Sequence, residues 1–479
     1  MTYKHGVYGE RKTASGVSQI SQGTVPVYIG SLPVQRIPDG FADYVNKPIL
    51  ISSYRQVNEL GLYSDDWSTF TLCEAIHAHF LNTDEPTAPI VLVNVLDPSE
   101  MQSEESTEVT VNLVKEGTSY VGYIDDAKCI VDELAITAES TTFSEGEVTY
   151  AYDGDKIKIK ITKSSFSATS VTATYKTVDF TADEVTTAEF ETALEAIDVC
   201  EQITGYIPNI IVAPQLSEKP ELHDLMVQKA IDKIAGKWNV ICISDIPSSA
   251  KTIEEAIAWK KTNNYSNKLD KVCYPKVATG DKTYHLSVLT AYTMQFVDIE
   301  NTDVPYVSPS NKTIGADSIV TDEGIIYLTE KQANTLNENG ITTANAIRGE
   351  IRLWGAHMAN YDYASIDNIS PEDRFDVCVR MSCYLFNYLQ YNHLDAIDTT
   401  ITKKDLDAIT NSVQTWLNSL VNANMLLYAT IKFDDDTDIA NGDIVFSIEV
   451  TYPIVAKSIT FKLIYTDAGL SVLTNGGVE

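Results

Sequence analysis

The residues that could carry metal or acid–base chemistry are few, and their spacing argues against such sites. His77 and His79 are two positions apart in a segment with helical periodicity, whereas side chains share a helix face at three or four. We therefore expect one histidine at the edge of the core and one at the surface. Carboxylate pairs such as Asp65-Asp66 and Glu254-Glu255 are expected by chance in a chain with 67 acidic residues.

An acidic run that begins at Asp434 resembles the start of a calcium-binding loop. Such loops have glycine at the sixth position and glutamate at the twelfth, but this chain has Ile439 and Val445 there. The pattern therefore favours a solvated hairpin tip. Motifs for phosphate loops, dinucleotide binding, nucleophile elbows and zinc proteases are missing, so we predict no catalytic residue, cofactor or metal.

Length, composition and charge limit the classes of protein that remain. The chain has 479 residues, of which 44% are apolar and 21% charged, as in a folded protein of several domains. With 35 basic and 67 acidic residues, the net charge of −32 disfavours nucleic acid and anionic membranes as partners. Because no secretion signal or membrane helix is recognisable, we expect synthesis in the cytoplasm. The 7 cysteines are expected to be reduced core residues.

Hydrophobic periodicity predicts an α/β region that a β-rich segment interrupts. The expected strands are at 48–52, 89–96, 208–213, 239–244 and 271–277, and the expected helices at 66–81 and 221–234. Between about 101 and 178 the chain alternates with period two, and Asp153-Gly154 marks a hairpin. The alternation of strands and helices outside this segment is typical of βαβ units.

The two ends of the chain need a separate explanation. Helices are predicted from Ser370 to Leu394 and over 403–422, and strands at 426–433, 444–452 and 459–465. The first 23 residues are polar and punctuated by glycine, so alone they would form a flexible arm. If an arm of another copy paired with the open edge of the C-terminal sheet, an open head-to-tail polymer would result. Termini that fold back on their own subunit are the alternative.

Several stretches resemble the contractile tail sheath proteins of phages and of phage-tail-like bacteriocins. They are HGVYGE at 5–10, VPVYIG at 25–30, NKPILIS at 46–52, APIVLVNV at 88–95, LNENGI at 336–341 and RLWGA at 352–356. No single stretch carries the resemblance, which lies in their order and spacing. It covers both ends and the α/β regions but not 101–178.

The resemblance implies a structural subunit that polymerises as hexameric rings around an inner tail tube and contracts to drive the tube through a cell envelope. The implied fold is a multidomain α/β protein with an inserted all-β domain and a C-terminal α+β domain. Terminal arms of neighbouring subunits would complete the small sheet of that C-terminal domain. The domains would be an N-terminal arm (1–23), an α/β core (24–100 and 179–318), an outward-facing β domain (101–178), a polymerisation domain (319–465) and a C-terminal arm (466–479).

Carried onto this sequence, the resemblance names three groups of residues. The arm residues would be Tyr3, Val7, Tyr8, Leu470, Val472 and Leu473. The receiving sheet would contain Phe446, Ile448, Val450, Ile459, Phe461 and Leu463. Tube contact would fall to Lys403, Lys404 and Asp407.

The expected partners follow from the same resemblance. They are further copies of the chain, the inner tail tube protein, and baseplate and tail terminator proteins, with no nucleic acid and no membrane insertion. The chain would be made in the bacterial cytoplasm, assembled into a virion tail or tail-like particle, and released by lysis. Because a charge of −32 on each copy opposes packing, lysine pairs such as Lys260-Lys261 and Lys403-Lys404 are expected on contact faces.

Two other classes of protein stay open. One is a soluble, acidic, hydrolase-like α/β enzyme with an appended β domain, and the other is an adhesion module that binds through 101–178. Behaviour on concentration separates them, because a sheath forms tubes whereas an enzyme stays a discrete oligomer.

Overall fold

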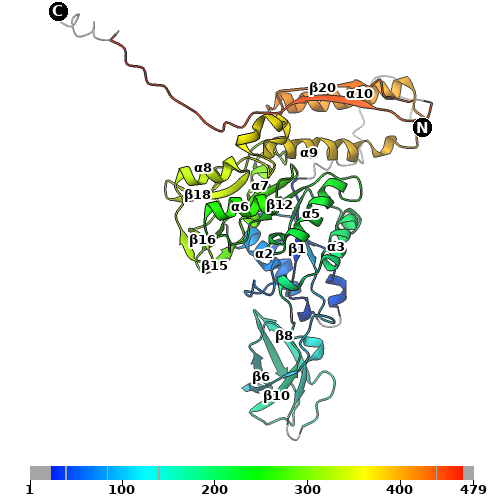
Figure 1. The fold of residues 1–479 in the computed structure, drawn as a ribbon. Helices are drawn as coiled ribbons and strands as arrows, with labels where there is room; N and C mark the ends of the chain where they lie inside the picture. The colour runs from blue at the N-terminus through cyan, green and yellow to red at the C-terminus, as the bar shows by residue number, and fades with distance from the viewer. Residues whose placement is uncertain (1–22, 38–39, 84, 139–140, 439, 468–479) are drawn as a thin grey trace, which may run out of the picture.

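The largest element of the molecule is an eight-stranded sheet (Figure 1). The computed structural model describes residues 23–37, 40–83, 85–138, 141–438 and 440–467. The strand order is β19-β18-β13-β12-β11-β1-β3-β2, in which the inner strands run parallel and β2 and β19 are antiparallel to their neighbours. The strands are β1 (Pro26–Gly30), β2 (Pro48–Ile51), β3 (Ile90–Asn94), β11 (Ile210–Val212), β12 (Ile241–Asp245), β13 (Asp270–Cys273), β18 (Ile341–Ile347) and β19 (Glu350–Trp354).

Helices cover both faces of this central sheet, which explains the continuous apolar runs of its strands. Every residue of β1, β3 and β12 is buried. Helix α2 contacts α7 and β1, while α3 contacts α5 and β3. The helices of this region are α1 (Tyr54–Leu60), α2 (Leu72–Phe80), α3 (Thr187–Ala196), α4 (Cys200–Thr204), α5 (Pro220–Asp232), α6 (Ile253–Thr262), α7 (Leu286–Glu300) and α8 (Glu330–Glu338). All seven cysteines are buried, as predicted for core residues.

The central sheet extends further along the chain than we predicted. Strands β18 and β19 lie within the segment 319–465, which the sequence analysis assigned to the C-terminal domain. In the structure β18 pairs with β13, so the boundary expected near residue 318 does not coincide with the end of the sheet. The strand predicted over 271–277 is divided into β13 and β14 (Lys276–Thr279), because Pro275 has no N–H for a ladder. Strand β14 belongs to a second sheet, with β15 (Lys282–Tyr284), β16 (Ser318–Thr321) and β17 (Gly324–Ile326).

For the two histidines of α2, the core-edge position fits His77, but the prediction of a surface position for the other was wrong. His79 is fully buried, and its ring nitrogens lie 2.6 Å from the hydroxyl of Tyr28 and 2.7 Å from that of Thr87. His77 is half-buried and lies 2.6 Å from the hydroxyl of Tyr284. Neither histidine is on the surface, because α2 lies between β1 and α7 and all of its residues except His77 are buried.

Strands β4 to β10 lie at one end of the molecule, away from the central sheet (Figure 1). They form two sheets, of order β4-β10-β7 and β5-β6-β9-β8, around their own buried residues, which include Ile159 and Val171. The predicted hairpin is present as the pair β8–β9, and Gly154 in its turn has the left-handed φ of 62° that glycine tolerates. The strands are β4 (Thr107–Asn112), β5 (Val114–Glu116), β6 (Ser119–Ile124), β7 (Ala135–Thr137), β8 (Val148–Asp153), β9 (Lys156–Ile161) and β10 (Ser170–Tyr175).

Arg36 holds the turn of the β8–β9 hairpin against the rest of the molecule. Its side chain is only 3% exposed, and Nη2 lies 2.6 Å from the carboxylate of Asp155. Nη1 donates to the carbonyl of Tyr63 at 2.9 Å, and the guanidinium lies over the ring of Tyr152. This one side chain therefore joins two parts of the molecule. It pairs with Asp155 in the β-rich segment 101–178 and bonds to Tyr63 in the α/β region.

We expect Arg36→Leu to lower the free energy of unfolding by about 3 kcal/mol, because Asp155 and a backbone carbonyl lose a buried partner. Urea denaturation measures this loss, and limited proteolysis should show faster cleavage between residues 101 and 178. Arg55→Leu is the matched control, since Arg55 pairs with Glu59 on the surface and its loss should cost less than about 1 kcal/mol. Equal effects of the two substitutions would contradict this role of Arg36.

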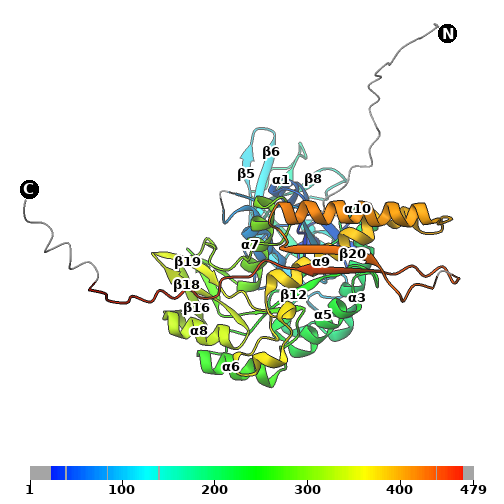
Figure 2. The same ribbon diagram turned by 90° about the horizontal axis from the view of Figure 1, so that it is seen from above.

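The last helices and strands form a separate layer beside the central sheet (Figures 1 and 2). Helices α9 (Asp376–Asn392) and α10 (Lys403–Asn422) pack with β20 (Tyr428–Phe433) and β21 (Phe446–Thr451) around a common core that includes Met381, Leu417 and Ile431. The predicted bounds of α10 are confirmed, and Thr402 and Asp405 form a capping box at its start. Helix α9 begins later than the predicted Ser370, because Pro371–Asp373 forms a separate 3-10 turn.

Candidate assembly surface

The small sheet β20–β21 has one face on α10 and the core of the C-terminal layer. Its strands are antiparallel, with Ile431 opposite Ile448 and Phe433 opposite Phe446. Ile431 is buried, while Phe446, Ile448 and Val450 are half-buried and pack against the same core. Three of the residues predicted for the receiving sheet therefore lie together on β21, and they face the core of their own subunit.

The two outer edges of this sheet differ. In the described part of the chain the sheet has only two strands, so each strand pairs on one side. On β20, the side chain of Gln414 from α10 accepts a hydrogen bond from Ile431 N–H at 3.1 Å and donates one to Ala429 C=O at 3.2 Å. For β21, no corresponding side chain is found among the described residues.

The residues predicted as a third strand lie outside this sheet. In the structure 459–465 form no strand, and the chain beyond β21 is extended and runs away from the body (Figures 1 and 2). Ile459 is 74% exposed, Phe461 91% and Leu463 101%, so these side chains are almost entirely in solvent. The sheet ends at Thr451 because Pro453 follows and cannot donate to a ladder. The exposed segment therefore begins before residue 466, where the C-terminal arm was expected.

Two contacts fix the place where this segment leaves the molecule. The hydroxyls of Tyr452 and Ser382 lie 2.6 Å apart, which ties the end of β21 to α9. Lys457 Nζ donates to Tyr361 Oη at 3.2 Å and lies 4.9 Å from the centre of the Tyr363 ring.

A neutral aromatic platform supports the Lys457 contact. Tyr361 is buried and stacks on His357, with 3.5 Å between the ring centres. Burial lowers the pKa of His357 to about 4, so this ring is neutral near pH 7 and does not repel the lysine.

The other predicted site residues fall into two groups. The arm residues Tyr3, Val7, Tyr8, Leu470, Val472 and Leu473 lie outside the described residues. The candidates for tube contact, Lys403, Lys404 and Asp407, are exposed at the start of α10.

One lysine proposed for a contact face was wrongly placed. Lys260 is buried, and its Nζ donates to the carbonyl of Ala359 at 2.7 Å. Burial lowers its pKa to about 8. Lys260 therefore belongs to the interior and offers no charge to a partner.

A buried group of titratable side chains lies where α7 begins. His285 Nδ1 lies 2.8 Å from the carboxylate of Glu74, and Ser287 donates to Asp245. Burial alone would lower the pKa of His285, but Glu74 and Glu218 raise it to about 10, while burial raises the pKa of Asp245 to about 6. Perturbed carboxylates can mark an active site, but Glu74, Asp245 and His285 are buried, and Glu74 and Asp245 accept hydrogen bonds from residues 285 and 287 at the start of α7. Their arrangement therefore positions a helix.

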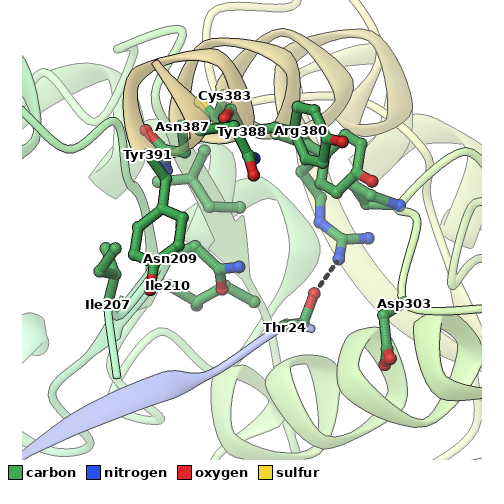
Figure 3. A pocket seen from close by; sticks show the side chains of 14 residues that line it. Thr24, Ile207, Asn209, Ile210, Asp303, Arg380, Cys383, Asn387, Tyr388 and Tyr391 are labelled. Atoms are coloured by element: carbon green, nitrogen blue, oxygen red, sulfur yellow. Dashed lines mark hydrogen bonds between the residues drawn. The ribbon is translucent and has the colours of Figure 1, made fainter. Parts of the chain in front are cut away.

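A cavity also lies between α9 and the start of β1 (Figure 3). Thr24, Arg380, Asn387 and Tyr391 line it, and Arg380 Nη2 donates to the hydroxyl of Thr24 at 3.3 Å. Its volume of about 60 Å³ admits ordered water but no organic substrate.

The loop between β20 and β21 contains the run that resembles a calcium site. Asp434 accepts from the backbone N–H of Asp436 at 3.0 Å, and Asp438 accepts from that of Ala440 at 3.1 Å. Apart from Ile439, which lies outside the described residues, this loop brings no three potential ligands together.

Sequence reasoning missed three residues that shape this surface, namely Gln414, Lys457 and Tyr361. Gln414 is one of several polar residues on α10, and Lys457 and Tyr361 are far apart in the sequence, so no spacing pattern could have indicated their contacts. Pro453 was a usable signal, because it interrupts the alternating pattern after β21.

Comparison of the sequence with known protein families gives one match. Residues 183–357, which include β11, β12, β13, β18 and β19, match the phage tail sheath protein central domain. No curated protein matches the sequence of the chain.

Solved structures share the fold over nearly the whole length. A chain of the anti-feeding prophage (AFP) baseplate has a TM-score of 0.57 at 12% identity, covering 97% of this chain and 100% of that chain. A chain of the PVC extracellular contractile injection system, in a contracted sheath complex, has a TM-score of 0.54 at 12% identity, covering 97% and 98%. The sheath tail protein from Desulfitobacterium hafniense has a TM-score of 0.53 at 11% identity, covering 94% and 100%.

At these identities the solved structures establish a common fold. That fold is a mixed α/β architecture with several sheets. Together with the central-domain match over 183–357, this shared fold supports a structural subunit of the contractile tail sheath type. Among the described residues, no helix has both the length and the apolar character to cross a bilayer.

Proposed function

We propose that this chain polymerises with copies of itself, as hexameric rings, into a helical sheath around an inner tail tube. Contraction of the sheath drives the tube through a target cell envelope. The observation that carries the proposal is that one subunit has both an open strand edge, at β21, and an exposed, alternating apolar segment, at 459–465. A subunit that offers a strand and accepts a strand forms open head-to-tail assemblies.

The physical driving force for such strand exchange is adequate. Each main-chain hydrogen bond contributes about 0.5–1.5 kcal/mol net, and each large apolar side chain that becomes fully buried adds about 1.5–3 kcal/mol. In the free subunit, exposure is 74% for Ile459, 91% for Phe461 and 101% for Leu463. Because these side chains have few contacts to lose, their burial in a neighbour would stabilise the assembly by nearly the full amount. The terminal arms 1–23 and 466–479 are proposed to take part in the same exchange.

Similarity to other particles supports the remaining parts of the proposal. A protein of the same fold occurs in a contracted PVC sheath complex and another in the AFP baseplate. We infer that this chain likewise changes its packing on contraction, and that its partners are the inner tube, the baseplate and a tail terminator. The strands of 101–178 form a β domain that faces outward, and Lys403, Lys404 and Asp407 contact the tube. The assembled particle leaves the bacterial cytoplasm by lysis.

Electron microscopy of the concentrated, purified chain tests the proposal directly. Long hollow tubes are the expected result, because strand exchange needs only copies of the same subunit. Adding the inner tube protein as a template should increase the number of tubes and shorten the delay before they form. Discrete particles of fixed size, with and without the tube protein, would contradict the proposal and favour a soluble oligomer.

We expect polymer formation to increase when salt is raised from about 0.1 M to about 1 M, because the Debye length then falls from about 10 Å to about 3 Å. The net charge of −32 on each subunit makes unscreened packing repulsive. Sedimentation of the polymer at several salt concentrations measures the effect. A steady loss of polymer with added salt would instead show that ion pairs between subunits dominate.

A further inference from the structure

The hydrogen-bonding pattern of the small sheet decides which backbone groups face outward. Asp434 N–H donates to Val445 C=O at 2.9 Å, which places residues 434 and 445 at a hydrogen-bonded position of the antiparallel ladder, although Val445 N–H donates to the hydroxyl of Thr437. Bonded and non-bonded pairs alternate, which makes 433/446, 431/448 and 429/450 non-bonded pairs. The backbone N–H and C=O groups of these residues therefore point away from the partner strand, toward the two outer edges.

The side chain of Gln414 occupies the outer edge of β20 as a neighbouring strand would. It accepts from Ile431 N–H at 3.1 Å and donates to Ala429 C=O at 3.2 Å, which satisfies one donor and one acceptor of that edge. Two further contacts hold the amide, since it donates to Asn418 Oδ1 at 2.9 Å and accepts from the hydroxyl of Thr430 at 3.3 Å. Covering an edge with a helix is a recognised way of preventing strand addition.

The opposite edge has no such cover in the described part of the chain. The outward groups of β21 belong to Phe446, Ile448 and Val450, and the chain after Thr451 leaves the sheet instead of folding back along it. The contact of Lys457 with Tyr361 holds that departing segment on the body of the molecule.

We propose that Gln414 is an edge cap that confines strand addition to β21, so that the small sheet grows on one side only. The occupant of the β21 edge is the exposed segment 459–465 of a second copy of this chain. This inference rests on the proposed function, because it specifies where the donated strand binds. Its consequence is a single direction of growth, since each subunit has one usable acceptor edge.

Hydrogen exchange at single-residue resolution tests the cap in the full-length chain, kept too dilute to polymerise. The probe is a synthetic peptide with the sequence of residues 457–467. In the unsubstituted chain we expect Ile431 N–H to be protected without peptide, and the peptide to protect Phe446, Ile448 and Val450. In Gln414→Leu, Ile431 N–H should exchange roughly tenfold faster, because one hydrogen bond is lost. The peptide should then protect both edges.

A matched control separates the cap from a general effect of a new leucine. Asn411→Leu places the same side chain on an exposed position of α10 and should leave both exchange patterns unchanged. Peptide protection of β20 in the unsubstituted chain, or unchanged exchange of Ile431 in Gln414→Leu, would overturn the cap. Faster exchange of Ile431 without peptide protection at either edge would keep the cap and refute strand donation by 459–465.

Discussion

Replacing both Phe461 and Leu463 with aspartate is expected to raise the concentration needed for polymer formation roughly a hundredfold or more, because two large apolar side chains would no longer be buried in a neighbour. These side chains are 91% and 101% exposed in the free subunit, so their loss removes little that stabilises the monomer. The monomer should therefore keep its secondary structure and melting temperature. Pelleting assays and electron microscopy measure assembly, and circular dichroism measures folding.

The control for this prediction is the same chemical change at another exposed apolar site. Ile325 on β17 and the neighbouring Tyr327 are 59% and 88% exposed, and their replacement by aspartate adds the same negative charge. If the segment 459–465 is the donated strand, this control assembles like the unsubstituted chain apart from the effect of charge. Equal loss of assembly in both double variants would show that added charge, rather than a lost strand contact, is responsible.

Lys271→Met is expected to lower the free energy of unfolding by about 3–5 kcal/mol, because it removes one partner of a fully buried ion pair. Lys271 on β13 lies 2.9 Å from the carboxylate of Asp376, the first residue of α9, and both side chains are 0% exposed. Its Nζ also donates to the carbonyl of Gly355 at 3.0 Å. The pair connects the central sheet to the C-terminal layer, so its loss should also loosen that layer.

Urea denaturation, monitored by fluorescence, measures this loss. Two further variants show whether it comes from the buried ion pair. Lys432→Met removes a lysine whose pair with Glu449 is exposed, and should cost less than about 1 kcal/mol. Combining Lys271→Met with Asp376→Leu should recover much of the loss, since no unpaired carboxylate then remains. If Lys271→Met alone unfolded at the same urea concentration as the native chain, the ion pair would have no role in joining the layers.

The local pattern of the sequence determined most of the regular elements. The bounds of α10 follow from its apolar stripe and the Thr402 cap, and the β8–β9 hairpin follows from alternation around Asp153-Gly154. Continuous apolar runs predicted β3, β11 and β12 as buried strands. These features depend on residues close together in the chain, so periodicity and turn chemistry suffice to predict them. The order and spacing of the stretches that resemble tail sheath proteins likewise pointed to a structural subunit.

Only the tertiary structure decided how distant segments use their polar groups. In the structure, β18 and β19 belong to the central sheet, and His79 and Lys260 are buried. The segment 459–465 lies outside the small sheet that it was expected to join. The difference between the two edges of the small sheet depends on Gln414 reaching β20, and the direction of the exposed segment depends on Lys457 meeting Tyr361. Alternation shows that a segment is compatible with a strand, but the neighbour that completes its hydrogen bonds is chosen by long-range packing.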